Sequence, residues 1–312
     1  VWRDLRVLVA DTLVVAGDAQ IRLQQLLHLQ QLQQQQSEGK EKGEEETEEE
    51  KSEEDYVKSF VDLAFGEFEI LEKCQLYHYL SSARQKKFNK SQVKRIVKET
   101  STLSTNLPIH SSSSIFLRVD SSRLDVLQAL ITGPAGTPYA NGCFLFDIFC
   151  HEGYPKKPPK VNLQTTGFGS VRFNPNLYNC GKVCLSLLGT WSGSQNETWD
   201  PEASTLLQVL VSIQSLIFVK DPYFNEPGYE ASMGTEAGKR ESDGYNANIR
   251  PETIKWAIVH QLEHPPPGFE DVIRLHFRLK KKETLLQAKK WLVSSPKNKE
   301  LVVKLSRLLG KL

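Results

Sequence analysis

The 312 residues suffice for one large domain or two small ones, so the chain can bury a sizeable core. A formal net charge of +1, from 39 basic and 38 acidic residues, gives no global indication of nucleic-acid or membrane binding. Five cysteines without a disulfide-framework spacing or a CxxC pair, and the lack of a long apolar run, favour a cytoplasmic protein with no metal, no cofactor and no membrane span.

The first 83 residues divide into three segments by composition. Residues 1–36 carry a helical apolar repeat and end in Gln-rich sequence, so we expect a partly helical lead segment. Residues 37–55 contain 11 acidic residues and 3 lysines and cannot offset the entropy of ordering, which predicts an acidic disordered linker, either a tether or a docking tail. Residues 56–83 are apolar and are expected to dock on the next domain. The first residue is Val1 rather than Met, which favours a fragment of a longer protein.

Residues 86–102 have the pattern of an amphipathic helix. Val93, Ile96 and Val97 form an apolar stripe that continues to Leu103. The other positions are basic: Lys87, Lys90, Lys94, Arg95 and Lys98. A solvated face explains this charge as well as a partner-binding face does.

Four strand-like segments follow, in residues 115–119, 125–131, 143–149 and 160–164. In the third, Phe residues alternate with other side chains, as expected of a strand with one buried face. Short connections rich in Gly and Pro separate the segments, and such connections join antiparallel neighbours. We therefore predict a four-stranded antiparallel meander.

Residues 173–184 are polar and turn-rich and end at Cys184, which enters an apolar run. Asn176 lies eight residues before this cysteine. A thiol is a nucleophile, and a carboxamide can donate hydrogen bonds to the oxyanion that develops during acyl transfer to or from sulfur. Cys180 is either an ordinary loop residue or a resolving thiol that forms a disulfide with Cys184 under oxidation.

The rest of the chain is predicted to be helical. Asp200 has the character of an N-cap, Pro201 of a first-turn residue, and residues 203–219 are apolar nearly all round, which predicts a buried central helix. Further helix candidates are residues 249–263, which stop at a proline run, then 269–279, 283–293 and 299–309.

The stretch at residues 173–184 resembles the active-site segment of ubiquitin-conjugating enzymes, in which an Asn reached through a Pro-Asn turn precedes the catalytic Cys by this interval. Asn174 stands where that motif usually has a His. Further landmarks of the family occur in order: the loop at residues 133–142, the Pro-rich loop at residues 154–161, and Trp199. The match covers roughly residues 84–292.

The resemblance implies an α+β UBC fold with an N-terminal helix, a four-stranded meander sheet, an active-site loop, a central buried helix and C-terminal helices. It also implies a catalytic domain over residues 84–295 and a C-terminal helical extension over residues 296–312. The implied partners are ubiquitin, its activating enzyme and protein substrates with acceptor lysines, in an ATP-dependent pathway.

The same resemblance implies the site residues. Cys184 would accept ubiquitin as a thioester, Asn176 would stabilise the oxyanion, and Glu226 would orient or deprotonate the incoming lysine, although the sequence alone favours a solvated carboxylate for Glu226. The active-site loop would include Asn174, Pro175 and Tyr178. The basic helix would bind the activating enzyme through Lys87, Lys90, Lys94 and Arg95. Loops that dock partners would carry Lys156, Lys157, Trp199 and Pro201.

Three features resemble large BIR-containing members that combine conjugating and ligase activity in one chain: Asn174, the insertion at residues 189–198 and the motif at residues 225–230. The loop at residues 154–157 lacks the Phe with which many members dock a separate ligase. A role in apoptosis control follows by analogy with such hybrids. The alternatives are a non-catalytic ubiquitin-binding scaffold of this fold and a conjugating enzyme for another ubiquitin-like modifier.

Overall fold

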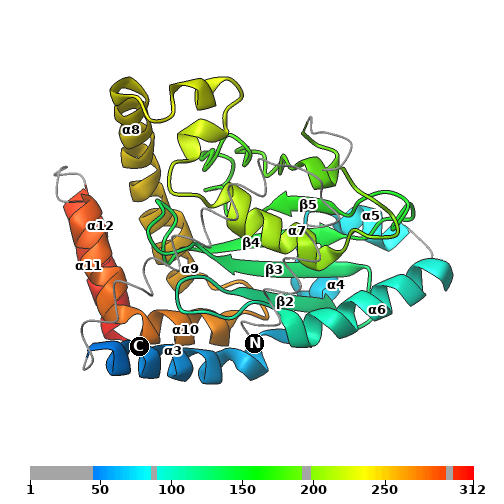
Figure 1. Cartoon of the computed structure of the whole chain (residues 1–312). Coiled ribbons are helices and arrows are strands. Elements are labelled where there is room, and N and C mark those ends of the chain that lie inside the picture. The colour runs from blue at the N-terminus through cyan, green and yellow to red at the C-terminus, as the bar shows by residue number, and fades with distance from the viewer. Residues whose placement is uncertain (1–44, 86–89, 192–197, 293–297) are drawn as a thin grey trace.

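The computed structural model of the protein describes residues 45–85, 90–191, 198–292 and 298–312. The architecture is α+β, as predicted, and its centre is a sheet in the order β1-β2-β3-β4-β5 (Figure 1). Strands β2 to β5 form the predicted antiparallel meander. The strands are β1 (Phe65–Phe68), β2 (Ile115–Asp120), β3 (Val126–Thr132), β4 (Cys143–Phe149) and β5 (Lys160–Leu163).

The prediction of four strands is wrong by one, because β1 adds a parallel edge to β2, with Phe65 opposite Leu117. Backbone bonds hold this edge: the Leu117 amide donates to the Ala64 carbonyl oxygen at 2.8 Å. The strand has four residues, includes Gly66 and lacks a clear alternation. Its partner is distant in the chain, so no local sequence pattern indicates it.

The disordered linker predicted over residues 37–55 is wrong for residues 45–55, which belong to helix α3 (Glu45–Phe60). Tertiary contacts offset the poor composition at the carboxyl end of this helix. Tyr56 and Phe60 are buried, and the Tyr56 hydroxyl bonds to Nδ1 of His276 at 3.0 Å. Glu53 accepts a hydrogen bond from the Ser111 amide at 3.0 Å. The lead segment 1–36 and residues 37–44 lie outside the described residues.

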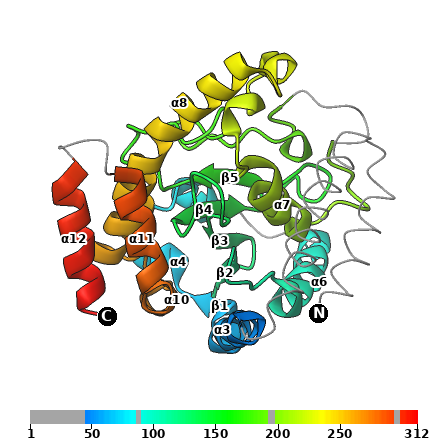
Figure 2. The ribbon, with the colours of Figure 1, turned by 60° about the vertical axis from the view of Figure 1, so that its left-hand side comes forward.

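Helices cover both faces of the sheet, with α6 (Lys90–Asn106) and α7 (Leu206–Ser212) on one side (Figure 2). Their core includes Leu117, Phe144 and Phe146. The opposite side faces α4 (Ile70–Lys73), α5 (Leu80–Gln85) and α10 (Glu270–Leu279), with a short turn at η2 (Val61–Leu63). Neighbouring strand residues such as Phe116 and Leu117 therefore belong to different cores, as the pleat requires.

Helix α6 forms close to its predicted range, but its apolar stripe differs by one position. Ile96 and Leu103 are buried as expected, whereas Val97 is 47% exposed. Gln92 and Glu99 complete the buried face, so the inward positions follow a spacing of four, three and four residues. The buried face thus includes two polar residues that the predicted apolar stripe left out.

The central helix is buried as predicted, but it begins later than expected. Thr205, not Asp200, is the N-cap: its hydroxyl accepts from the Gln208 amide at 3.2 Å, and Gln208 Oε1 accepts from the Thr205 amide at 2.9 Å. Asp200 instead accepts from the Glu202 amide at 2.8 Å and closes the preceding turn. The helix α7 then continues as a π-helical turn, η4 (Ile213–Ile217).

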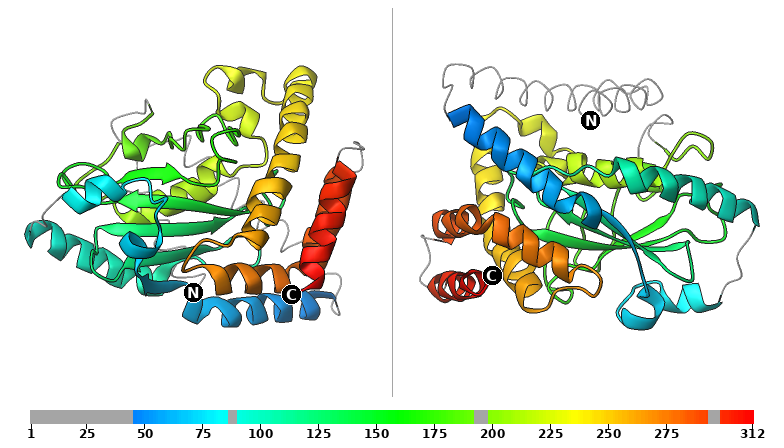
Figure 3. Two further views of the ribbon diagram at one scale, coloured as in Figure 1. Left: turned by 180° about the vertical axis from the view of Figure 1, so that it is seen from behind. Right: turned by 90° about the horizontal axis from the view of Figure 1, so that it is seen from below.

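The helix predicted over residues 249–263 begins earlier, because α8 (Glu236–Glu252) precedes η7 (Thr253–Val259) and α9 (His260–Glu263) without a break. Gly238 and Gly244 weaken the pattern of α8, while the Thr235 hydroxyl caps it by accepting from the Gly238 amide at 3.0 Å. The last two helices, α11 (Lys281–Leu292) and α12 (Lys299–Gly310), lie side by side at one edge of the molecule (Figure 3). Leu305 and Leu309 of α12 are buried.

Candidate active site

The loop after β5 folds back on itself and buries the candidate nucleophile. Leu177 bridges both Asn174 and Val183, and Cys184 is 1% exposed. Gly181 permits the close turn: its φ is +84°, and a Cβ there would lie 2.5 Å from the Leu163 carbonyl oxygen. Three short helical turns follow in the chain: η3 (Ser186–Leu188), η5 (Pro222–Asn225) and η6 (Tyr229–Ser232).

Asn174 lies at the centre of the loop's hydrogen bonds and is fully buried. Its Nδ2 donates to the Ile217 carbonyl oxygen at 2.8 Å and to the Tyr139 hydroxyl at 3.0 Å. Its Oδ1 accepts from the Asn176 amide at 2.8 Å and from Nδ2 of Asn225 at 3.4 Å. Asn174, which stands where the family motif usually has a His, therefore joins the active-site loop to the central helix and to the loop that follows this helix.

Asn176 is bound to the candidate nucleophile itself. Its Nδ2 donates to the carbonyl oxygen of Cys184 at 2.9 Å, and the Cys184 amide donates to the carbonyl oxygen of Asn176 at 2.8 Å. The Oδ1 of Asn176 is buried and accepts no hydrogen bond from the described residues. The side chain thus braces the loop in this conformation, with one polar atom unused.

Opposing effects act on the thiol. Burial raises the pKa of Cys184, whereas the positive charges of Lys182 and Arg172 lower the pKa of Cys184. All five cysteines are free, and Cys180 is exposed while the other four are buried. Among the described residues, no group of three or more His, Cys, Asp or Glu side chains is arranged to hold a metal ion.

Arg172, which the sequence did not single out as a functional residue, connects several parts of the site. Its Nη2 donates to the Pro175 carbonyl oxygen at 2.8 Å and lies 3.2 Å from Oε2 of Glu226. Its guanidinium carbon lies 4.4 Å from the centre of the Tyr178 ring, while Lys182 Nζ lies 5.5 Å from the same ring. No local pattern could have indicated this role, because Glu226 lies 54 residues further along the chain.

Asn225 is a second residue that sequence analysis missed. Besides its contact with Asn174, its Nδ2 donates to the Leu216 carbonyl oxygen at 3.2 Å. The rings of Tyr223 and Tyr229 pack with their centres 4.7 Å apart in the same loop. These contacts hold the loop that carries Glu226 against the active-site loop, so the structure brings Glu226, Pro175 and Tyr178 together around Arg172.

The residues predicted to bind an activating enzyme differ in their exposure and contacts. Lys94 is exposed, Lys90 lies at the start of the helix, and Lys87 lies outside the described residues. Arg95 is used within the chain: it pairs with Glu99, and its Nη1 donates to the Pro201 carbonyl oxygen at 2.9 Å. This internal use of the guanidinium counts against a docking role for Arg95.

The predicted docking loops contact each other. Nε1 of Trp199 donates to the Pro155 carbonyl oxygen at 2.6 Å, and its ring lies 5.6 Å from the ring of Tyr154. Trp199 and Pro201 are half-buried, whereas Lys156 and Lys157 are exposed. The two lysines are therefore the accessible members of this group.

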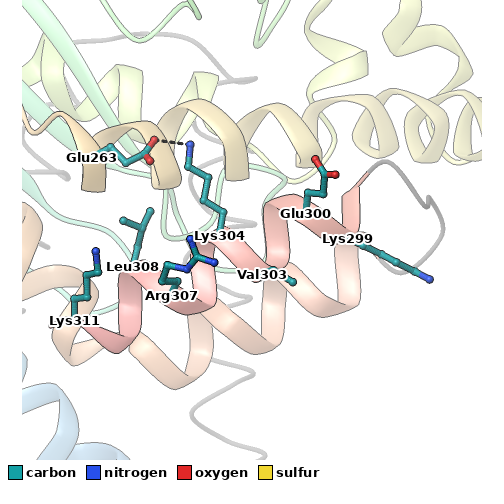
Figure 4. Close-up of a pocket in the computed structure, with 8 residues that line it drawn as sticks. All are labelled: Glu263, Lys299, Glu300, Val303, Lys304, Arg307, Leu308 and Lys311. Atoms are coloured by element: carbon teal, nitrogen blue, oxygen red, sulfur yellow. Dashed lines mark ion pairs between the residues drawn. The ribbon is translucent and has the colours of Figure 1, made fainter.

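A groove of about 510 Å³ runs along α12 (Figure 4). Its lining residues follow the predicted site residues in the chain. Lys304 lies across it and pairs with Glu263, with Nζ 2.8 Å from Oε2. Its lining consists of Glu263, Lys299, Glu300, Val303, Lys304, Arg307, Leu308 and Lys311. The groove contains none of the predicted catalytic residues and is not part of the candidate active site.

We compared the chain with known proteins to identify the class that has this fold and a buried thiol beside an asparagine. The ubiquitin-conjugating enzyme model matches residues 95–253, about half of the chain. The chain belongs to the ubiquitin-conjugating enzyme family, a family of transferases, and its α+β architecture is the UBC fold.

Individual relatives extend this assignment. The chain is 51% identical over 249 residues to the human dual E2 ubiquitin-conjugating enzyme/E3 ubiquitin-protein ligase BIRC6, covering 77% of this chain and 5% of the relative. It is 52% identical over 203 residues to the probable ubiquitin-conjugating enzyme protein 17 of Caenorhabditis elegans, covering 65% of this chain and 28% of the relative. It is 48% identical over 225 residues to the probable ubiquitin-conjugating enzyme E2 25 of Arabidopsis thaliana, covering 72% and 35%. The sequence therefore corresponds to a minor part of each of these relatives.

Proposed function

We propose that the chain accepts ubiquitin from an activating enzyme as a thioester on Cys184 and transfers it to substrate lysines. The observation that carries this proposal is the pairing of the buried Cys184 with Asn176 through two hydrogen bonds in one loop. Membership of a transferase family named for ubiquitin conjugation supports it independently. The identity with a dual conjugating enzyme and ligase supports a place as the catalytic part of such a hybrid.

The transfer step follows from the chemistry of a thioester. The neutral amine of a lysine attacks the thioester carbonyl carbon, a C–N bond forms, and the C–S bond breaks. The electron pair of the broken bond leaves on the sulfur of Cys184, and the proton lost by the amine passes through Glu226 to water. Asn176 would turn its Nδ2 from the Cys184 carbonyl oxygen to the oxyanion, and preorganised donors of this kind stabilise developing charge strongly.

Two opposing effects act on the protonation of the Cys184 thiol in the proposed reaction. Positive charge from Lys182 and Arg172 favours the thiolate, which is the form that attacks the incoming ubiquitin thioester and the form that leaves. Burial opposes this and keeps the free thiol protonated until the site is engaged. We infer that Cys184 is a protonated thiol in the free protein and becomes the reactive thiolate when ubiquitin and its activating enzyme bind.

Three wider proposals have separate grounds. The free cysteines favour a reducing compartment, so we infer a cytoplasmic protein. We infer a part in apoptosis control by analogy with BIR-containing hybrids. We infer transfer without an added ligase in the parent chain, because the name of BIRC6 joins both activities and Lys156 stands in the docking loop. No helix that the structure describes has the length and apolar character to cross a bilayer.

Two alternatives predict different products. A non-catalytic scaffold of this fold would bind ubiquitin without forming an adduct, and the presence of both Cys184 and Asn176 argues against it. An enzyme for another modifier would form an adduct with that modifier instead. Incubation with each activating enzyme, ATP and each modifier, followed by non-reducing electrophoresis, distinguishes all three; an adduct with ubiquitin supports the proposal, and an adduct with a different modifier alone contradicts it.

A further inference from the structure

The ion pair between Arg172 and Glu226 joins two segments that the hydrogen bond between Asn225 and Asn174 already connects. Arg172 precedes the active-site turn, and Glu226 directly follows η5, 54 residues further along the chain. The two side chains are 43% and 37% exposed. Exposed ion pairs contribute little to the free energy of folding, because solvent screens them and ordering both side chains opposes them. Stability is therefore a poor explanation for the pair.

The guanidinium of Arg172 is held more firmly than the ion pair alone would hold it. The same Nη2 bonds to the Pro175 carbonyl oxygen at 2.8 Å, and the planar group lies over the Tyr178 ring at 4.4 Å. Both hydrogen bonds come from the one nitrogen Nη2, while the flat guanidinium lies over the Tyr178 ring. The compact ammonium of a lysine has no flat face that such a ring could orient. Arg172 thus fixes where the Glu226 carboxylate lies relative to the Asn174–Asn176 turn.

We propose that Arg172 is a positioning residue of the transfer reaction, whose guanidinium holds the Glu226 carboxylate at the acceptor side of the Cys184 loop. This inference rests on the proposed function, because it assigns a geometry to the group that receives the proton of the lysine amine. Arg172 does not touch the reacting atoms. It acts through Glu226, and its own charge acts at the thiol through space.

Two roles of Arg172 can be separated because they need different properties of the side chain. The through-space effect on the thiol needs only a positive charge, so Arg172→Lys retains it and Arg172→Gln does not. The hold on Glu226 also depends on the planar guanidinium, which the Tyr178 ring orients, so Arg172→Lys loses much of it. Both variants should fold normally, since the side chain is half-exposed.

The test uses the full chain in a Cys180→Ser background, so that the exposed thiol does not react, with Arg240→Gln of α8 as a matched exposed-arginine control. Alkylation of Cys184 by iodoacetamide, followed over pH without ubiquitin, reports the thiol. Single-turnover discharge of the ubiquitin thioester to free lysine, over a range of lysine concentrations, reports the transfer. Melting temperatures are recorded for every variant.

We expect Arg172→Gln to slow the maximal discharge rate about tenfold, because small losses of alignment are costly in transfer reactions, and to shift the alkylation profile to higher pH. Arg172→Lys should keep the alkylation profile and still discharge slowly. Combining Arg172→Lys, which keeps the charge at the thiol, with Glu226→Gln should be no slower than Glu226→Gln alone, since Arg172 acts on the transfer through Glu226.

Normal discharge by Arg172→Gln, or additive losses in the double variant, would overturn the inference. Full rescue of discharge by Arg172→Lys would also overturn it, because charge alone would then account for the effect. Failure of the unmodified chain to form any thioester would instead contradict the proposed function, while the alkylation profile would still report the effect of Arg172 on the thiol.

Discussion

Asn176 and Cys184 hold each other through two hydrogen bonds, from Asn176 Nδ2 to the Cys184 carbonyl oxygen at 2.9 Å and from the Cys184 amide to the Asn176 carbonyl oxygen at 2.8 Å. The amide side chain that would stabilise the transition state is thus committed to the backbone of the nucleophile before reaction. Under the proposed function Asn176 serves both structure and catalysis, and the two roles can be distinguished by measurement.

Asn176→Ala should leave thioester formation intact and slow discharge to lysine by about 10²–10³-fold, the usual effect of removing one oxyanion donor. It should also lower the free energy of unfolding by about 1 kcal/mol, because one loop hydrogen bond is lost. Asn179→Ala is the control, since Asn179 is exposed in the same loop and donates to the Gly169 carbonyl oxygen at 2.9 Å. Unimpaired discharge by Asn176→Ala would remove its catalytic role.

Adjacent residues of α6 should respond differently to substitution. Arg95→Ala should destabilise the chain by about 1–3 kcal/mol, because the carbonyl groups of Pro201 and Ser204 lose their donor. Lys94→Ala should leave stability unchanged and raise severalfold the concentration of activating enzyme needed for half-maximal loading. Denaturant titration and initial loading rates measure the two effects. Equal loading by Lys94→Ala and the unmodified chain would exclude Lys94 from the docking face.

Phe60 tests whether α3 belongs to the folded domain. Its side chain is fully buried, with its ring 5.1 Å from that of Phe116 in β2. Phe60→Ala should lower the free energy of unfolding by about 3–5 kcal/mol through lost burial and a new cavity. The neighbouring Val61 is 62% exposed, so Val61→Ala should change stability little. Similar small effects of both substitutions in urea titrations would mean that α3 is not anchored in this way.

Asp147 of β4 should make stability depend on pH. Its carboxylate accepts from Gln128 Nε2 and from the His78 amide, both at 2.7 Å, and no cation pairs with it among the bonds that the structure describes. Burial raises the pKa of Asp147 to about 7, against a value of about 4 in an unfolded chain. The folded state therefore holds this proton more tightly, and stability should fall as pH rises from about 4 to 7.

Asp147→Asn removes this titration, so the fall in stability across that pH range should become shallower. Asp62→Asn, at an exposed position of η2, is the matched control. Burial lowers the pKa of the nearby His78, but His78 is present in all three proteins, so the difference between their slopes isolates Asp147. Parallel pH profiles for all three proteins in denaturant titrations would contradict a raised pKa at Asp147.

The sequence predicted the parts of the fold that local patterns encode. The strands from Ile115 onward alternate or are apolar and lie between clear turns, and they form where expected. The family motif likewise indicated Cys184 and Asn176. In contrast, β1 forms by pairing with a distant strand, and α3 is held by contacts with His276 and Ser111, so neither follows from local composition.

Within the candidate site, sequence analysis identified the residues with obvious chemistry and missed those that arrange them. The Arg172–Glu226 pair and the Asn225–Asn174 contact each join positions more than 50 residues apart in the chain. Asp200 had the right side chain for an N-cap, but Arg95 holds the following carbonyl groups in a turn and moves the helix start to Thr205. Competing tertiary hydrogen bonds decided these positions.

The most direct test of the account is the chemical identity of the bond to ubiquitin at residue 184. The unmodified chain, incubated with activating enzyme, ATP and ubiquitin, should form an adduct that thiol reductant removes. Cys184→Ser should form an adduct slowly and retain it in reductant as an oxyester, Cys184→Ala should form none, and Cys180→Ser should behave as the unmodified chain does. A reductant-sensitive adduct on Cys184→Ala, or its loss in Cys180→Ser, would move the nucleophile away from Cys184 and contradict the account.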